Sequence, residues 1–90
     1  MKIEDLNKII DSRVKTNKKN SYTNKLLKLG PKKIAQKFGE ETTELIVDYL
    51  SGTKKRTTEE AVDVIYHLFV LLKSKKISLS EINKELSKRK

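Results

Sequence analysis

The segment AVDVIYHLFVLL at residues 61–72 limits what this chain can fold into more than any other part of it. Its apolar residues recur at the spacing of a helix, and most of them share one face. Val64, Val70 and Leu71 fall on other sides, so this helix has to be covered over most of its surface. A chain of 90 residues has only a small core to offer, so we expect a second copy of the chain to complete the cover.

The other segments also have helical patterns, and none shows the alternation of a strand over a useful length. Ser21 or Thr23 can cap a short helix that ends at Gly30, and Pro31 suits the first position of the next helix. Further helices are predicted over residues 3–14, 31–50, 57–72 and from 78 onward, with a solvated loop at 15–20 and a turn at 51–56. The chain is therefore predicted to be all-α, with one domain over residues 1–90.

Two pairs of residues have the spacing of a capping box, in which a hydroxyl residue caps the helix and an acid three residues later caps it in return. Thr57 with Glu60 is predicted to open the most apolar helix, and Ser78 with Glu81 to open the last one.

The composition excludes several classes of protein. Without cysteine the chain has no disulfide, no thiolate metal site and no cysteine nucleophile. Its longest apolar run, within residues 64–72, is interrupted by His67 and is too short to span a bilayer. The first residues, MKIEDLNKII, carry acids where a signal peptide needs a basic segment followed by an apolar one. We therefore expect a cytoplasmic protein with no membrane partner.

Charge is unevenly distributed along the chain, whose formal net charge is +9. Residues 1–39 carry a net +8, residues 40–63 a net −4 and residues 64–90 a net +5. A protein that coats nucleic acid gains nothing from an acidic block at its centre, so we expect no nucleic-acid partner. A site that holds a divalent cation beside a polyphosphate needs both signs of charge close together.

The acidic block has its carboxylates at helical spacing. On a helix Glu44 lies about 60° from Glu41 and about 40° from Glu40, so the three share a face, and Glu60 and Asp63 repeat the three-residue spacing. A short connection makes the two helices antiparallel neighbours, so the carboxylates can converge. Their mutual repulsion has to be offset by positive charge. Oxygen ligands without cysteine indicate Mg²⁺, with Mn²⁺ as a possible substitute.

The alternative interpretation is that these acids lie on solvated helix faces and pair with the abundant lysines. Asp63 argues against it, because a charge inside an apolar stretch is costly without a partner. Asp48 is expected to lie outside the metal site, and His67 to be a satisfied histidine within the bundle. Arg56 and the lysines before it are expected only to keep the turn soluble.

The pattern EExxE at residues 40–44 with ExxD at 60–63 resembles the signature of the MazG-like superfamily of all-α nucleotide pyrophosphohydrolases. Four longer blocks resemble one family within it, the phosphoribosyl-ATP pyrophosphatases of histidine biosynthesis. These blocks are SYTNKLL at 21–27, GPKKIAQKFGEETTE at 30–44, EEAVDVIYHLFVLL at 59–72 and ISLSEINKEL at 77–86. Thr42 and Thr43 depart from the family pattern, in which small apolar residues are common at these positions.

The resemblance implies a four-helix-type bundle assembled as a homodimer, and a Mg²⁺-dependent enzyme acting on a small nucleotide. It would hydrolyse 1-(5-phosphoribosyl)-ATP to 1-(5-phosphoribosyl)-AMP and pyrophosphate, an early step of histidine biosynthesis. The metal-binding acids of the family match Glu41, Glu44, Glu60 and Asp63. Glu40 matches the first acid of the motif and is the candidate catalytic residue, as a water-activating or supporting group.

Two further groups of residues are candidates for binding the substrate. One group lies at a helix N-terminus, where the backbone already favours phosphates, and comprises Lys32, Lys33 and Lys37. The other belongs to the SYT block and comprises Ser21, Tyr22 and Thr23. Helix capping by the two hydroxyl residues and simple packing by the tyrosine would explain the second group equally well.

Two other functions stay open at this point. The acidic motif alone also fits a housecleaning hydrolase of free nucleoside triphosphates or their deoxy forms. A small basic dimer with a pI of about 9.8 could instead bind nucleic acid, although the acids of residues 40–63 weigh against that.

Overall fold

The structure is a computed structural model that describes residues 1–16 and 21–89. Within these ranges the chain forms helices and no strand, which confirms the predicted all-α fold. The helices are α1 (Ile3–Thr16), α2 (Tyr22–Leu29), α3 (Pro31–Ser51), α4 (Lys54–Ser74) and α5 (Leu79–Lys88). Of the loop predicted at 15–20, the first two residues belong to α1 and the remaining four lie outside the described residues.

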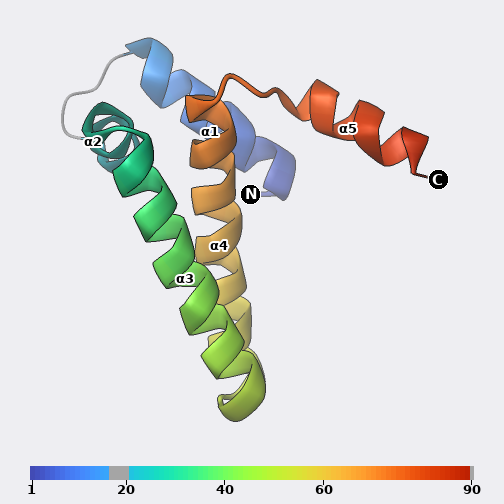
Figure 1. Cartoon of the computed structure of the whole chain (residues 1–90). Coiled ribbons are helices and arrows are strands. Elements are labelled where there is room, and N and C mark those ends of the chain that lie inside the picture. The colour runs from blue at the N-terminus through green and yellow to red at the C-terminus, as the bar shows by residue number, and fades with distance from the viewer. Residues whose placement is uncertain (17–20, 90) are drawn as a thin grey trace.

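The two longest helices, α3 and α4, lie side by side as an antiparallel hairpin (Figure 1). Only Gly52 and Thr53 separate them. A Cβ atom at Gly52 would come within 2.7 Å of Asp48 Oδ1 and 2.9 Å of the Asp48 carbonyl oxygen, so the tight connection requires glycine. This connection fixes which residues of α3 face which residues of α4.

The predicted start of α4 was wrong by one turn. Thr53 caps the helix, because its side-chain oxygen accepts a hydrogen bond of 3.1 Å from the backbone N–H of Arg56. Thr57 lies inside the helix, where its hydroxyl bonds the carbonyl oxygens of Thr53 (2.9 Å) and Asp48 (3.0 Å). The hydroxyl of Thr57 therefore ties α4 to the end of α3, and Glu60 is left for another role.

Three other predicted helix boundaries are confirmed. Ser21 caps α2 by accepting a hydrogen bond of 3.0 Å from the backbone N–H of Asn24. Gly30, at φ 94°, ends α2 in a backbone conformation that favours glycine, and Pro31 begins α3. The capping box that opens α5, with Ser78 and the acid three residues later, is fully formed.

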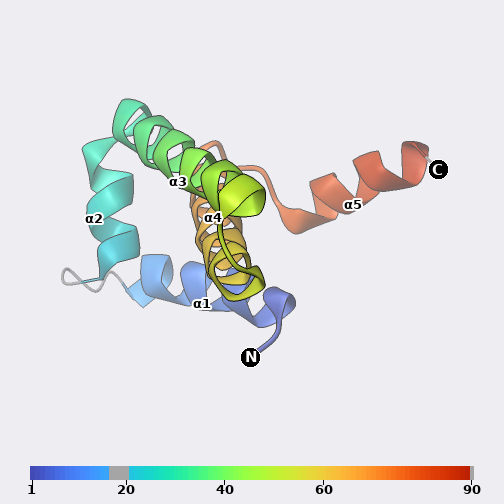
Figure 2. The same ribbon diagram turned by 90° about the horizontal axis from the view of Figure 1, so that it is seen from below.

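The hydrophobic core lies at one end of the hairpin, where α1 and α2 pack against α3 and α4 (Figures 1 and 2). Its buried residues are Ile10, Leu26, Ile34, Phe69 and Val70. All of the first four helices thus contribute to one core, which holds the start of α3 against the end of α4.

The opposite end of the hairpin is not covered by the described residues. Exposed large apolar side chains at this end are Ile46, Val47, Tyr49, Leu50 and Val62. Helix α5 extends away from the other helices in both views and buries none of its residues (Figures 1 and 2). The helix that was expected to need cover on most sides is therefore covered only in part by its own chain. Among the described residues, no helix is both long enough and apolar enough to cross a membrane.

A candidate metal and nucleotide site on the α3–α4 hairpin

Three carboxylates from the two long helices meet midway along the hairpin. Glu41 of α3 and Glu60 and Asp63 of α4 each offer one oxygen, and these atoms all lie within 4.8 Å of one another. The hairpin's short connection and the three-residue spacing on α4 place them there. We call these three residues the carboxylate cluster. It contains three of the four acids predicted to bind metal.

Glu60 is the buried member of the carboxylate cluster, with 4% of its surface exposed. Its Oε1 atom accepts a hydrogen bond of 2.7 Å from the guanidinium of Arg56. Its Oε2 atom is buried and receives no hydrogen bond from any residue that the structure describes. Leaving a buried carboxylate oxygen without a partner costs on the order of 1–3 kcal/mol or more. Either a bound cation or a proton shared with the neighbouring Glu44 carboxyl would satisfy this oxygen.

Burial and the neighbouring acids raise the pKa of two members of the carboxylate cluster. Burial raises the pKa of Glu60, and the neighbouring Glu44 raises it further. Burial likewise raises the pKa of Glu41, with further contributions from Glu44 and Asp63. Glu44 is exposed and lies outside the close group of three, yet its charge acts on two of the three members. It therefore lies at the rim of the cluster.

The donor atoms fit a hard divalent cation. They are all carboxylate oxygens, and the chain has no cysteine. The single histidine, His67, has both ring nitrogens engaged, Nδ1 at 2.8 Å from the Asp63 carbonyl oxygen and Nε2 at 3.1 Å from the Tyr22 hydroxyl. It is satisfied within the bundle, as predicted. A cation between the carboxylates would supply the partner that Glu60 Oε2 lacks.

Glu40 lies on the exposed side of α3, outside the carboxylate cluster. Its Oε1 accepts a hydrogen bond of 3.0 Å from Gln36, and its Oε2 lies 3.5 Å from the ammonium of Lys37. The Gln36 hydrogen bond is the main reason that the pKa of Glu40 is lowered. Glu40 is therefore ionised at neutral pH, but it is a weaker base than an unpaired carboxylate.

The three candidate phosphate-binding lysines differ in their surroundings. Lys37 is half-buried, and the Glu40 charge raises its pKa. Lys32 and Lys33 are exposed on the first turn of α3, and the charge of Lys33 reaches Glu40. The charge of Lys37 acts on the carboxylate of Glu41 as well as on that of Glu40.

The SYT block begins α2 and packs against α4. Ser21 is the helix cap, and Thr23 is fully buried with its hydroxyl bonded to that of Tyr66. Tyr22 remains 46% exposed although its hydroxyl bonds His67. In this arrangement Tyr22 has a surface to offer a substrate, whereas Thr23 supports the packing of α2.

Comparison with known proteins identifies the family of this chain. The sequence model of the phosphoribosyl-ATP pyrophosphohydrolase family matches residues 3–90. The chain belongs to this family. It is 46% identical to the phosphoribosyl-ATP pyrophosphatase of Clostridium novyi, over 98% of this chain and 80% of the relative. It is 44% identical to that of Sulfolobus acidocaldarius (97% and 92%) and 40% identical to that of Cereibacter sphaeroides (97% and 84%). The family resemblance seen in the sequence is thereby confirmed.

In this family member Arg56 contacts the candidate site, which its place in a predicted turn did not indicate. Its guanidinium lies 2.7 Å from Glu60, 3.3 Å from Glu59 and 3.8 Å from Asp48. It therefore ties both helices together beside the carboxylate cluster, rather than only keeping the turn soluble. The four-residue spacing of Arg56 and Glu60 was the available signal. Asp48 was expected to lie outside the metal site. It is not a member of the carboxylate cluster, and it pairs with Arg56.

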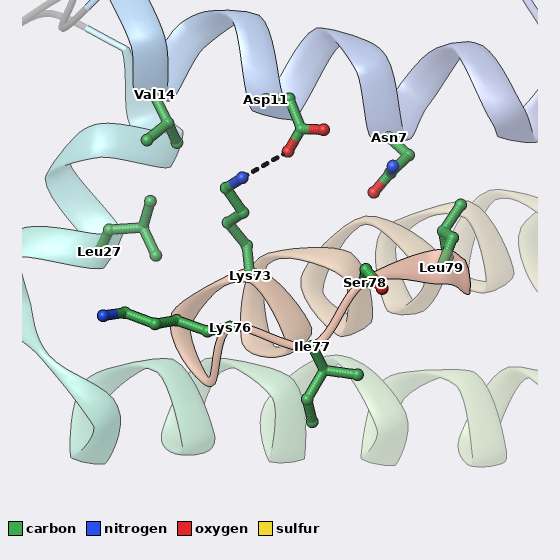
Figure 3. Close-up of a pocket in the computed structure, with 9 residues that line it drawn as sticks. All are labelled: Asn7, Asp11, Val14, Leu27, Lys73, Lys76, Ile77, Ser78 and Leu79. Carbon is green, nitrogen blue, oxygen red and sulfur yellow. Dashed lines mark ion pairs between the residues drawn. The ribbon is translucent and has the colours of Figure 1, made fainter. Parts of the chain in front are cut away.

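A cavity of about 490 Å³ lies apart from the carboxylates, between α1 and the segment that joins α4 to α5 (Figure 3). Asp11 and Lys73 form an ion pair of 2.7 Å across it, and Leu27 and Leu79 supply part of its apolar lining. Lys76 adds a second ammonium group to its lining. It contributes none of the predicted site residues of this pyrophosphohydrolase family member.

Proposed function

We propose that this chain hydrolyses the α–β phosphoanhydride of 1-(5-phosphoribosyl)-ATP, giving 1-(5-phosphoribosyl)-AMP and pyrophosphate, an early step of histidine biosynthesis. The match to the family over residues 3–90 carries this proposal. Relatives that are 40–46% identical over nearly the whole chain carry the name phosphoribosyl-ATP pyrophosphatase. The carboxylate cluster beside basic side chains suits a polyphosphate substrate.

The cofactor of the proposed reaction is Mg²⁺, with Mn²⁺ as a substitute. Glu41, Glu60 and Asp63 would hold it, and Glu44 at the rim is the fourth proposed ligand. When bound, the ion supplies neutralisation of phosphate charge and a more acidic water. The support for this proposal is the buried, unpartnered Oε2 atom of Glu60, which needs a positive or proton-bearing neighbour.

The chain's own residues would bind and orient the substrate and would accept the proton of the attacking water. Lys37 and the exposed lysines of the first turn of α3, Lys32 and Lys33, would bind phosphate oxygens near the helix N-terminus. Glu40 would accept the proton of the attacking water, since it is ionised at neutral pH. Arg56 would keep Glu60 in place with one oxygen free.

The working form is proposed to be a cytoplasmic homodimer. The exposed apolar side chains at the open end of the hairpin are too many for an isolated monomer of this size. A second copy would cover them with the same residues of its own, as a two-fold interface requires. The mass of one chain is 10.4 kDa. Sedimentation or size-exclusion measurements at micromolar concentration should therefore give twice this mass. A monomer at that concentration would contradict the proposal.

One assay tests the activity. Pyrophosphate release is measured from phosphoribosyl-ATP and from a panel of nucleoside triphosphates and deoxynucleoside triphosphates, each with and without Mg²⁺. We expect turnover of phosphoribosyl-ATP only with the metal. Turnover confined to the triphosphates would instead support a housecleaning hydrolase. Absence of turnover together with salt-sensitive DNA binding would reject both enzymes.

A pair of variants tests the site within that assay. Asp63→Asn should reduce the rate to below about 1% of the unmodified chain, because it removes a proposed ligand of the charge-neutralising ion. Glu4→Gln removes an exposed acid of the first turn of α1 and is the matched control, expected to retain full activity. Near-normal rates in Asp63→Asn would show that the metal site has been misplaced.

A further inference from the structure

Tyr22 and His67 form a link between α2 and α4 that metal binding does not explain. The Nδ1 atom of His67 lies 2.8 Å from the main-chain oxygen of Asp63, which can only accept a hydrogen bond. Nδ1 therefore carries the proton, and in the neutral ring Nε2 accepts from the Tyr22 hydroxyl at 3.1 Å. Because only 7% of the surface of His67 is exposed, the orientation of its ring is fixed. The Tyr22 hydroxyl proton is thereby directed toward α4.

Ring packing holds Tyr22 from a second side. The Tyr22 and Tyr66 rings are stacked with centroids 6.1 Å apart, and the edge of His67 lies 5.9 Å from Tyr22 and 5.1 Å from Tyr66. The Tyr66 hydroxyl is in turn bonded to the buried hydroxyl of Thr23. Such arrangements are the favoured geometries of aromatic pairs. Both the hydroxyl and one face of the Tyr22 ring are therefore held in place.

The rest of the Tyr22 ring is open to solvent, since 46% of the residue is exposed. Through His67 the Tyr22 hydroxyl is joined to the main chain of Asp63, a member of the carboxylate cluster. The charges of Lys37 and Glu41 both act on the Tyr22 hydroxyl, whose pKa is raised mainly by burial. A flat aromatic side chain that is rigid on one side and open on the other, beside a phosphate-binding lysine, is suited to stacking against a nucleotide base.

We propose that the Tyr22 ring is the stacking surface for the purine base of the substrate, and that His67 is the positioning residue that holds this ring. The inference rests on the proposed function, which gives the substrate its purine. Stacking of a base on an aromatic side chain is worth about 5- to 150-fold in affinity. The hydroxyl of Tyr22 serves the histidine, so the ring rather than the hydroxyl contributes to binding.

The test compares two ligands that differ in the base. Calorimetric affinities for AMP and for ribose 5-phosphate are measured in Mg²⁺ with the full chain, Tyr22→Leu and Tyr22→Phe. We expect Tyr22→Leu to lose about tenfold or more for AMP and less than about twofold for ribose 5-phosphate. Tyr22→Phe keeps the ring and should stay within about threefold for AMP. Equal losses for both ligands, or a phenylalanine variant as weak as the leucine variant, would overturn the stacking role.

A second comparison tests the role of His67. His67→Gln should weaken AMP binding in the full chain but cause no additional loss in Tyr22→Leu, because a positioning residue acts only through the ring it holds. Additive losses would overturn the positioning role. If circular dichroism shows that His67→Gln is unfolded, His67→Phe, which keeps a ring at this position but lacks the nitrogen that bonds Tyr22, replaces it in the comparison.

These outcomes are distinct from a failure of the proposed function. A wild-type chain that does not hydrolyse phosphoribosyl-ATP rejects the proposed reaction, whereas the AMP and ribose 5-phosphate comparison still decides whether Tyr22 stacks a base. A wild-type chain that binds AMP no better than ribose 5-phosphate rejects the stacking surface alone.

Discussion

Glu60→Gln separates metal binding from folding, because Glu60 combines burial with one unpartnered oxygen. Glutamine has nearly the same shape, and its side-chain oxygen can still accept the hydrogen bond that Arg56 gives to Oε1 at 2.7 Å. What the substitution removes is the negative charge of the buried carboxylate. The metal-free variant should therefore fold, while its carboxylate cluster should no longer hold a divalent cation.

The size of the effect follows from linkage. A cation present at ten times its dissociation constant stabilises the folded state by about 1.4 kcal/mol. In a domain of this size 1 kcal/mol shifts the thermal midpoint by roughly 4–8 °C, so Mg²⁺ should raise the midpoint of the unmodified chain by roughly 6–11 °C. The same concentration should shift Glu60→Gln by less than about 2 °C, and the pyrophosphatase rate of the variant should fall below about 1%.

Thermal unfolding is followed by circular dichroism with and without Mg²⁺, for the unmodified chain, Glu60→Gln and Glu4→Gln. The last variant removes an exposed acid remote in sequence from the hairpin and should respond to Mg²⁺ like the unmodified chain. An equal Mg²⁺ shift in Glu60→Gln would refute the reasoning, since it would place the cation elsewhere. A variant that is unfolded without metal would show that the charge itself is needed for folding.

Three further predictions concern stability without metal. Thr53→Ala should cost about 1 kcal/mol in urea unfolding because it removes the cap of α4, whereas Thr58→Ala within the same helix should change little. Arg56→Gln should lower the thermal midpoint, because Glu60 loses its charged donor. Burial raises the pKa of Glu60 and Glu41 above the 4.5 of a free side chain, so the folded protein holds these protons more tightly than the unfolded chain. Their contribution to stability is present at or below about pH 4.5 and is lost as the pH rises through the raised pKa values. The thermal midpoint should therefore fall over that pH range, and saturating Mg²⁺ should reverse the fall.

The convergence of the carboxylates could be predicted from the sequence because it depends on two local features. Three- and four-residue spacings place side chains on one helix face, and a connection of a few residues makes two helices antiparallel neighbours. Which acids meet depends also on how α3 is rotated relative to α4, and the spacing does not contain that information. The rotation brings Glu41 to the carboxylate cluster, leaves Glu44 at its rim and leaves Glu40 on the exposed side of α3, where it pairs with Gln36 and Lys37 of the same helix.

The start of α4 shows the opposite case, in which a local pattern was misleading. Thr53 and Thr57 are four residues apart, and each is a possible cap. The local pattern favoured Thr57, because Glu60 follows it at the spacing of a capping box. In the structure Arg56 binds Glu60, and the Thr57 hydroxyl bonds the end of α3. Tertiary contacts with the neighbouring helix decided between the two caps, and one sequence window does not contain those contacts.

The excess of basic residues in this chain does not neutralise the carboxylate cluster. Within the described residues, Lys37 pairs with Glu40 outside the cluster, and Arg56 occupies only one oxygen of Glu60. Burial raises the pKa of Glu41 and Glu60, and the neighbouring acids raise it further. We therefore propose that the balancing charge comes from solution. A divalent cation would provide it in the smallest volume, and the exposed Lys32 and Lys33 would not be needed at the carboxylates and could bind the phosphates.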